Sequence, residues 1–383
     1  MKAVFIGHFA PLSRALEHAS SAAGNQVQRQ IADELARRCG SARAACFSMT
    51  PQPFWPRGPL LSSSETEGSI EFLGYLNLPV LKHLLFSLRL FGHLLATRPQ
   101  LCLQYNSYLF ENLTLLLYRL LRQGSGVAII IQDIHVAPDA PMLSKAGLRS
   151  LSERASLFLS RFFDMIVPIS REIVEDFGMN PNKCLVFQGG ITEFGARLMN
   201  GPNDEALADV GVFAGALEPY NGIDLLIERW QTDGIETVLH VFGRGSLAER
   251  VKQAAKGCGN IVYHGFQPEH LVLAWQRCAR WNFCLRYSAG INQTYFFPSK
   301  LFNIVCAPGV VVVNDFQALP TSIKAHLCVV RDDLLDLAVR LRNSSVLSSP
   351  ARVTARRQIV QAEHNWGSCV QQVLLTLQRV PNA

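Results

Sequence analysis

The stretch FPSKLF at residues 297–302, followed by APGVVV at residues 307–312, decides the fold of this chain. Pro298 is typical of the first turn of a helix, where its missing N–H is not needed. The order of apolar residues, glycine and valines then predicts a short helix, a break and a buried strand. Free backbone N–H groups at Ser299 and the ammonium of Lys300 attract an anion at the start of this helix. The stretch therefore predicts a phosphate site within an α/β sheet, although an ordinary helix between two strands fits it as well.

Strand and helix patterns alternate along the rest of the chain, which predicts parallel sheets covered by helices on both faces. The pattern pauses between Thr192 and Asp209 and then restarts, so two doubly wound domains and a cleft between them are expected. Ser170 is expected to cap the helix that follows it. The expected strands are Lys2–Gly7, Leu101–Leu103, Val127–Ile131, Met165–Ile169, Cys184–Phe187, Val210–Ala214, Thr237–Phe242, Ile261–His264, Asn282–Leu285 and Val310–Val313. The expected helices are Gln26–Arg38, Leu76–Thr97, Glu172–Phe177, Ile223–Trp230, Pro268–Ala279 and Cys369–Gln378.

Composition narrows the class of protein. The 383 residues are 49% hydrophobic and carry a net charge of +6, which is too mild to favour nucleic acid but suits a phosphorylated substrate or an anionic lipid surface. The ten cysteines show neither C-x-x-C pairs nor zinc-finger spacing, so neither disulfides nor zinc are expected. Residues 3–10 read as a buried strand, and no apolar run is long enough to cross a membrane.

These motifs resemble retaining GT-B glycosyltransferases of family 4, whose donor signature is PSK-x-x-E-Y-x-x-x-G-x-P-V. Residues 164–170 with 183–190, and residues 213–217 with 221–226, resemble further family segments in the same order. The resemblance implies the GT-B fold, with two Rossmann-like domains facing across a cleft. Residues 1–195 would bind the acceptor and residues 205–365 the nucleotide sugar, while residues 366–383 would form a helix crossing back to the first domain.

The same resemblance implies an enzyme of the hexosyltransferase type. It would move a sugar from a nucleoside-diphosphate sugar to a glycan or lipid-linked acceptor, with retention, in polysaccharide biosynthesis. The protein would be cytoplasmic, or peripheral on the inner face of the membrane. No metal cofactor is required, because Lys and Arg can neutralise the phosphates.

Two pairs of residues are the candidates for catalysis. Arg286 and Lys300 would stabilise the leaving diphosphate, with a solvated surface side chain as the alternative for Arg286. Asp133 and His135 follow the Val127–Ile131 strand and would orient the acceptor, or would merely cap a helix and pack in the core.

Other residues are candidates for donor binding. Gly24 and Asn25 end a loop like the family's Gly-Gly loop, with a simple helix start as the alternative. The remaining donor candidates are Gly215, Gly243, Ser299 and Asn303, and those for the base and sugar are Gly265, Phe266, Asn292, Gln293, Thr294 and Tyr295.

The chain departs from the family pattern at functional positions. Ala216 and Asn221 stand where the family has an Arg and a Lys, and Tyr295 and Asn303 stand where it has a pair of glutamates. An amide lacks the charge-assisted strength of a carboxylate. Two other functions therefore stay open: a catalytically silent GT-B scaffold or partner subunit, and a nucleotide-sugar epimerase.

The helix expected over residues 76–97 is oily and interrupted by basic residues. Such a helix can dock on an anionic membrane interface through Leu81, Lys82, Leu85 and Arg89. A packed core helix with a polar edge is the alternative.

Overall fold

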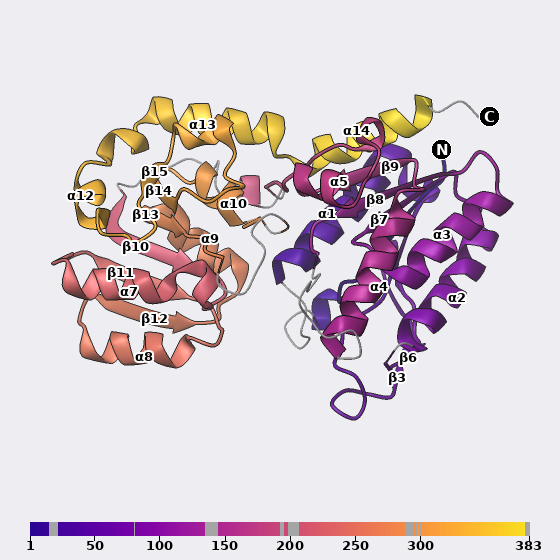
Figure 1. Ribbon diagram of the computed structural model, residues 1–383, viewed down its shortest axis with the longest axis horizontal. Helices are drawn as coiled ribbons and strands as arrows, with labels where there is room; N and C mark the ends of the chain where they lie inside the picture. Colours follow the sequence, from indigo (N-terminus) through magenta and orange to yellow (C-terminus); the bar gives the residue numbers. More distant parts are fainter. Residues whose placement is uncertain are drawn as a thin grey trace. The chain divides into compact units, whose positions relative to one another are not determined.

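The computed structural model describes residues 1–14, 22–79, 81–134, 145–191, 195–197, 207–288, 295, 297–298 and 300–379 (Figure 1). The chain forms two compact units. Unit 1 comprises Met1–Gln188 with Trp366–Ala383, and unit 2 comprises Gly189–Asn365. Among the described residues, no helix combines the length and the apolar character that a membrane span requires.

Unit 1 is built on a seven-stranded sheet in the order β4-β5-β2-β1-β7-β8-β9. Its strands run parallel, except that β4 pairs antiparallel with β5. A two-stranded antiparallel sheet, β3-β6, accompanies it. The strands are β1 (Ala3–Gly7), β2 (Ala44–Ser48), β3 (Leu61–Ser62), β4 (Glu65–Glu67), β5 (Ile70–Phe72), β6 (Tyr75–Leu76), β7 (Leu101–Tyr105), β8 (Gly126–Ile131) and β9 (Met165–Pro168).

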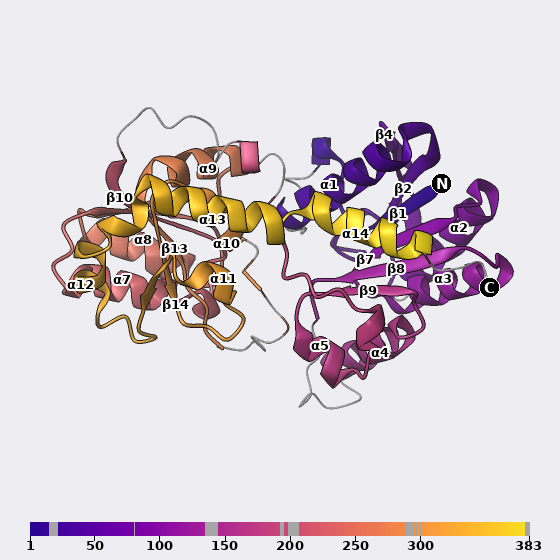
Figure 2. The same ribbon diagram turned by 90° about the horizontal axis from the view of Figure 1, so that it is seen from above.

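Helices cover both faces of this sheet (Figure 2). Ala3 and Phe5 of β1 point to a core that includes Val27 of α1 and Val370 of α14, because alternate strand residues face the same side. Helices α2, α3 and α4 pack side by side in that order. The helices of unit 1 are α1 (Ala22–Cys39), α2 (Leu81–Thr97), α3 (Leu109–Leu121), α4 (Lys145–Ser160), α5 (Arg171–Asp176) and α14 (Trp366–Arg379).

Unit 2 has a six-stranded sheet in the order β12-β11-β10-β13-β14-β15, and these neighbouring strands pair in parallel. Its main core packs Phe213, Trp281 and Val312 of the sheet against apolar residues of α7, α8 and α12. The strands are β10 (Ala208–Ala214), β11 (Val238–Phe242), β12 (Ile261–Gly265), β13 (Ala279–Cys284), β14 (Val310–Asn314) and β15 (Cys328–Val330). The helices are α7 (Ile223–Thr232), α8 (Ala248–Gly257), α9 (Glu269–Cys278), α10 (Lys300–Cys306), α11 (Thr321–Lys324), α12 (Leu337–Arg342) and α13 (Pro350–Glu363).

A buried arginine holds the end of α10. Arg356 of α13 has no exposed surface, and its guanidinium donates to the carbonyl oxygens of Ala307, Gly309 (2.6 Å) and Leu347 (3.0 Å). Ala307 and Gly309 belong to the segment that links α10 to β14. Arg356 therefore connects the end of α10 to α13.

The structure corrects several predicted boundaries. Cys184–Phe187 is not a regular strand. The Leu185 and Phe187 N–H groups donate to Ile166 O and Pro168 O of β9 at 2.9 Å, but the pairing amounts to one isolated bridge, between Ile166 and Cys184. The helix predicted over Leu76–Thr97 begins at Leu81, after the short strand β6. Ser170 occupies the N-cap position of α5, but its side chain makes no capping hydrogen bond. Ala279 belongs to β13 rather than to the preceding helix.

Candidate functional site

Four loops of unit 2 meet at one edge of its sheet. Gly215, Gly243 and Arg286 follow β10, β11 and β13, and Gly265 is the last residue of β12. Parallel strands bring their carboxyl ends to the same edge, where ligands bind in open α/β sheets. Hydrogen bonds join the loops: the Gly215 N–H donates to Phe242 O at 3.0 Å, and the Gly243 N–H donates to Gly265 O at 2.8 Å.

Gly243 is required by this close approach. Its φ is +143°, and a β-carbon at this position would lie 1.8 Å from Gly215 O. Only glycine permits both the backbone conformation and the contact. The loops after β10 and β11 are therefore held against one another by the absence of a side chain at Gly243.

Arg286 is a buried side chain, 7% exposed, and not the solvated arginine of the alternative interpretation. Its Nη1 donates to Asn221 Oδ1 at 3.0 Å, and its guanidinium lies 5.0 Å from the Tyr220 ring centroid. Asn314, the last residue of β14, holds the Arg286 backbone through two hydrogen bonds of 2.8 Å. Asn221 also donates to Ala216 O at 2.8 Å. Arg286 thus brings positive charge to the turn where the family resemblance leads one to expect a cation.

Lys300 is the first residue of α10. Its Nζ lies 3.9 Å from the position that a Gly215 β-carbon would take, and Asn221 Nδ2 lies equally close to that position. Within the described part of the chain, no carboxylate lies within 4.0 Å of this Nζ. Lys300 is an exposed residue, yet desolvation by nearby protein atoms lowers the pKa of its ammonium, while Glu269 opposes this shift. An anion at Gly215 would offset the free-energy cost of keeping this ammonium charged among protein atoms.

Glu269 is a site residue that the sequence reasoning missed. It is the first residue of α9, and burial raises its pKa to about 7, with Lys300 acting in the opposite direction. Its Oε2 is buried and has no hydrogen-bond partner among the described residues. An acidic residue in the first turn of a helix that follows a strand at the ligand-binding edge was the available signal.

The neighbouring candidates for base binding include an exposed aromatic ring. Phe266 is 44% exposed, and the Arg244 guanidinium lies 4.7 Å from its ring centroid. Asn303 is half-buried one turn after Lys300, and therefore lies on the same side of α10. Tyr295 is half-buried, whereas Asn292, Gln293, Thr294 and Ser299 lie outside the described residues.

The candidates in unit 1 are placed differently. Gly24 and Asn25 belong to the first turn of α1, so the predicted boundary between loop and helix is wrong, while their role in donor binding stays a prediction. Asn25 is buried, and its Oδ1 accepts a 3.4 Å hydrogen bond from the Ala10 N–H. Asp133 is exposed after β8, with its carboxylate 3.2 Å from Asn106 Nδ2. His135 lies outside the described residues.

The predicted docking residues of α2 divide between surface and interior. Leu81 and Arg89 are exposed, whereas Leu85 and Lys82 are half-buried, and the Lys82 ammonium lies 4.3 Å from the Phe54 ring centroid. Leu81 also belongs to a stripe of exposed leucines that recur at seven-residue intervals along α2. This stripe consists of Leu81, Leu88 and Leu95.

A pocket of about 850 Å³ opens elsewhere in unit 1. It is lined by residues that include Gln100 and Gly126, which lie at the amino ends of β7 and β8. Arg119 and Asp164 also line it, and they form an ion pair of 2.7 Å. It therefore lies at the opposite edge of the sheet from Asp133, and none of the predicted site residues lines it.

Solved structures with a similar fold are glycosyltransferases. The α,α-trehalose-phosphate synthase (UDP-forming) from Burkholderia xenovorans, in complex with glucose-6-phosphate, has a TM-score of 0.69 and 11% identity over 99% of this chain and 100% of that chain. Sucrose-phosphate synthase from Thermosynechococcus elongatus has a TM-score of 0.66 and 13% identity over 99% of both chains. HepE from Anabaena, in complex with UDP and glucose, has a TM-score of 0.63 and 13% identity over 99% of this chain and 100% of that chain.

No family model matches the sequence, and neither does any curated protein. The similarity in structure nevertheless extends over nearly the whole chain. It confirms the predicted α/β class and the GT-B fold with two Rossmann-like domains. At these identities it shows the fold alone, so the chemistry has to be argued from the site.

Proposed function

We propose that the protein is a glycosyltransferase whose unit 2 binds a nucleoside-diphosphate sugar. The observation that carries the proposal is the position of the Lys300 ammonium beside Gly215, at the carboxyl edge of the sheet. The Arg286–Asn221 pair lies at the same edge. Two cations and a glycine loop form a surface that suits a diphosphate. In a GT-B fold, the ligand that contains a diphosphate is the nucleotide sugar.

The reaction follows from the charge of this site. The bond between the anomeric carbon of the sugar and the donor phosphate oxygen breaks, and negative charge builds up on the diphosphate. Lys300 and Arg286 stabilise that charge without a metal ion. The acceptor hydroxyl oxygen forms the new bond to the anomeric carbon, and its proton passes to the departing phosphate. This route gives retention and needs no protein nucleophile.

The proposed donor site also has a place for the nucleoside. Phe266 offers an exposed ring beside Arg244, and base stacking on such a ring contributes about 1–3 kcal/mol. Asn303 lies one turn beyond Lys300, and we propose that its side-chain amide binds a ribose hydroxyl. We propose a hexosyl donor and a glycan or lipid-linked acceptor, as in polysaccharide biosynthesis.

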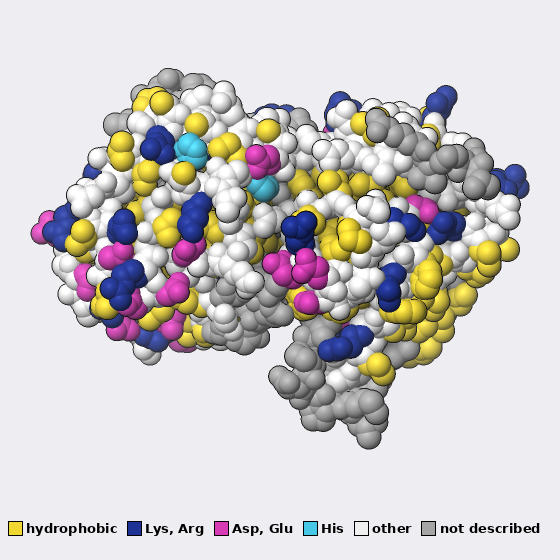
Figure 3. All heavy atoms as spheres, turned by 45° about the horizontal axis from the view of Figure 1, so that its top comes forward, with side chains coloured by type: hydrophobic (Ala, Val, Ile, Leu, Met, Phe, Trp, Pro, Cys, Tyr) yellow, Lys and Arg dark blue, Asp and Glu magenta, His cyan; other side chains and the backbone are white. Residues whose placement is uncertain are grey.

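We further propose that unit 1 docks peripherally on an anionic lipid surface. Hydrophobic side chains gather on unit 1 on the side of α2 and α3 (Figure 3). The outer face of α2, α3 and α4 exposes Leu81, Leu88, Leu95, Leu113, Leu117, Leu120, Leu151 and Phe158. Exposed arginines on and after α3 and α4 accompany it, namely Arg122, Arg149, Arg154 and Arg161. Apolar side chains flanked by arginines match the boundary between acyl chains and acidic headgroups.

A catalytically silent GT-B partner subunit is the second candidate. The observation in its favour is the absence of carboxylates at Tyr295 and Asn303, where the family resemblance leads one to expect a pair of glutamates. A silent subunit would bind no nucleotide, or would bind it without turnover.

A thermal-shift screen of the full chain against UDP, GDP, ADP and their hexose conjugates tests the proposal. An enzyme of this kind is stabilised by one nucleotide class and slowly hydrolyses the matching sugar donor. Stabilisation without any donor hydrolysis or transfer, with every acceptor class supplied, would favour the silent subunit. No stabilisation by any nucleotide would contradict the donor site.

A further inference from the structure

We propose that His8, His83 and Glu111 of unit 1 form a binding site for a divalent transition-metal ion of the zinc type. The three residues come from separate elements. His8 follows β1 at its carboxyl end, and His83 and Glu111 lie in the first turns of α2 and α3. All three residues belong to unit 1, whereas the residues of the proposed donor site belong to unit 2. We call the three residues the metal triad.

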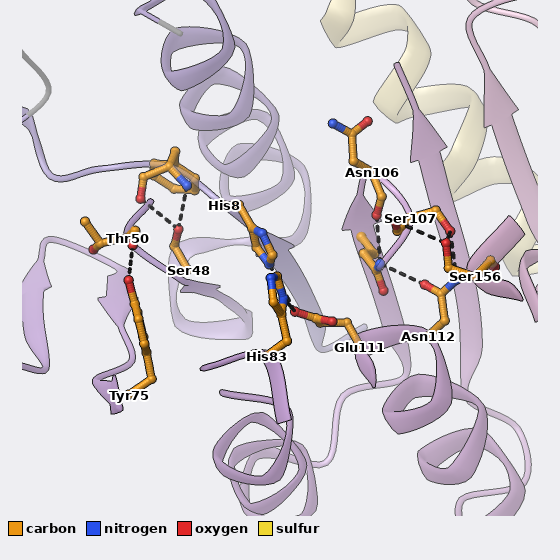
Figure 4. A network of polar contacts seen from close by, with 12 residues as sticks. His8, Ser48, Thr50, Tyr75, His83, Asn106, Ser107, Glu111, Asn112 and Ser156 are labelled. Carbon is orange, nitrogen blue, oxygen red and sulfur yellow. Dashed lines mark hydrogen bonds and ion pairs between the residues drawn. The ribbon is translucent and has the colours of Figure 1, made fainter. Parts of the chain in front are cut away.

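The ligand atoms of the metal triad converge (Figure 4). Glu111 Oε1 lies 3.0 Å from His83 Nδ1 and 3.3 Å from His8 Nε2, and all three ligand atoms lie within 4.8 Å of one another. Zinc bonds of about 2.0–2.1 Å at tetrahedral angles separate neighbouring ligand atoms by roughly 3.3 Å. The two short separations are therefore close to those of a bound ion, and only a small rearrangement would bring all three atoms onto one metal.

The donor set of the triad suits an ion of this type. Two imidazole nitrogens and one carboxylate oxygen are ligands that zinc takes in proteins, and catalytic zinc sites commonly hold three protein ligands.

A buried carboxylate without enough partners is a further indication. Glu111 has no exposed surface, and its Oε2 has no hydrogen-bond partner among the described residues. A buried carboxylate oxygen without a hydrogen-bond partner is costly. A divalent cation would supply positive charge to that oxygen, while the ammonium of nearby Lys82 would oppose its binding.

The rings of the triad are held before any ion arrives. Tyr108 stacks on His8 with ring centroids 3.9 Å apart and lies 5.6 Å from the His83 ring. Phe86 meets His8 edge-on at 5.7 Å. Ligand side chains that are already held in place lose less entropy when the metal ion binds. Three protein ligands also leave a fourth position for water or a hydroxyl group of a substrate.

The experiment uses the full chain, stripped with a chelator and then titrated with Co²⁺ and Zn²⁺. We expect one ion per chain, with the visible absorption of tetrahedral Co²⁺ and without the thiolate charge-transfer band that the free cysteines would give. His83→Gln should weaken binding by 10- to 100-fold or more. His83 is the variant of choice because its ring is 26% exposed, whereas a substitution of the fully buried Glu111 risks misfolding.

His93→Gln is the matched control. His93 lies on the same helix α2 and faces Glu71 at 3.6 Å on the surface. This variant should bind Co²⁺ like the unchanged protein, and circular dichroism should show that both variants are folded. The inference is overturned if the folded, unsubstituted chain binds no ion. Equal affinities for the His83→Gln and His93→Gln variants, or a thiolate spectrum, would overturn it as well.

Discussion

Removing the ammonium of Lys300 should weaken nucleotide binding without weakening the fold. The pKa of Lys300 is lowered from 10.5 because protein atoms displace water from the ammonium, with Glu269 opposing. At pH 7 the unfolded chain carries this charge freely, whereas the folded chain carries it at a cost. Lys300→Met removes that cost, so the free energy of unfolding should stay equal or rise.

The loss in binding is set by one charge-assisted contact. Such a contact contributes about 1.5–3 kcal/mol, so the Kd for the nucleotide should rise roughly 10- to 150-fold. At a nucleotide concentration of 100 times the original Kd, binding stabilises the fold by about 2.7 kcal/mol. A Kd that is about thirty-fold weaker leaves about 0.9 kcal/mol of this stabilisation at the same concentration.

Calorimetric titration measures the Kd for the nucleotide, and thermal shift measures how much the bound nucleotide stabilises the fold. Lys252→Met is the matched control, because Lys252 is exposed on α8 and pairs with Glu249 at 2.5 Å. The control should bind the nucleotide normally. Unchanged nucleotide affinity in Lys300→Met, or a large fall in its free energy of unfolding, would refute the reasoning.

Three other substitutions test the rest of the account. Gly243→Ala should destabilise unit 2 by at least about 2 kcal/mol in urea unfolding, because the new β-carbon would lie 1.8 Å from Gly215 O. The control Gly257→Ala should not destabilise it, because a β-carbon there would have no other atom within 4 Å. Glu269 has a folded pKa raised from 4.5 to about 7 by burial, so its stabilising contribution is complete below pH 4.5 and is lost as the pH rises through 7. The stability gained by Glu269→Gln should therefore increase over that interval, and a gain independent of pH would contradict it. Leu88→Glu, at a side chain 59% exposed, should reduce sedimentation with anionic liposomes several-fold, while Leu375→Glu on α14, 44% exposed, should not; equal binding by both variants would remove the docking surface.

The sequence predicted the repeating strands well, because buried parallel strands are runs of apolar residues with clear ends. Val310–Val313 and Ile223–Trp230 lie within the observed β14 and α7. The start of α1 was wrong, since Gly24 is a poor helix former and its helical state is set by packing rather than by propensity. Cys184–Phe187 failed as a strand for the opposite reason: the residues are apolar and two of their N–H groups bond to β9, but the pairing stops at one isolated bridge.

Candidate site residues were found where a motif or a strand end marked them. Arg286 and Gly215 follow predicted strands, and the carboxyl-edge rule applies to them directly. Glu269 escaped, because its pKa is raised by burial, which only the folded structure shows. The metal triad escaped for the same reason. Its ligands lie 75 and 28 residues apart in the chain, so no spacing rule brings them together before the fold is known.

A crystal structure of the chain with its best-binding nucleoside diphosphate tests the central claim most directly. The account predicts the diphosphate at Gly215, within hydrogen-bond distance of Lys300 Nζ and close to the guanidinium of Arg286. A nucleotide bound elsewhere, such as in the pocket beside Gln100 and Gly126, with Lys300 making no contact to phosphate, would contradict it.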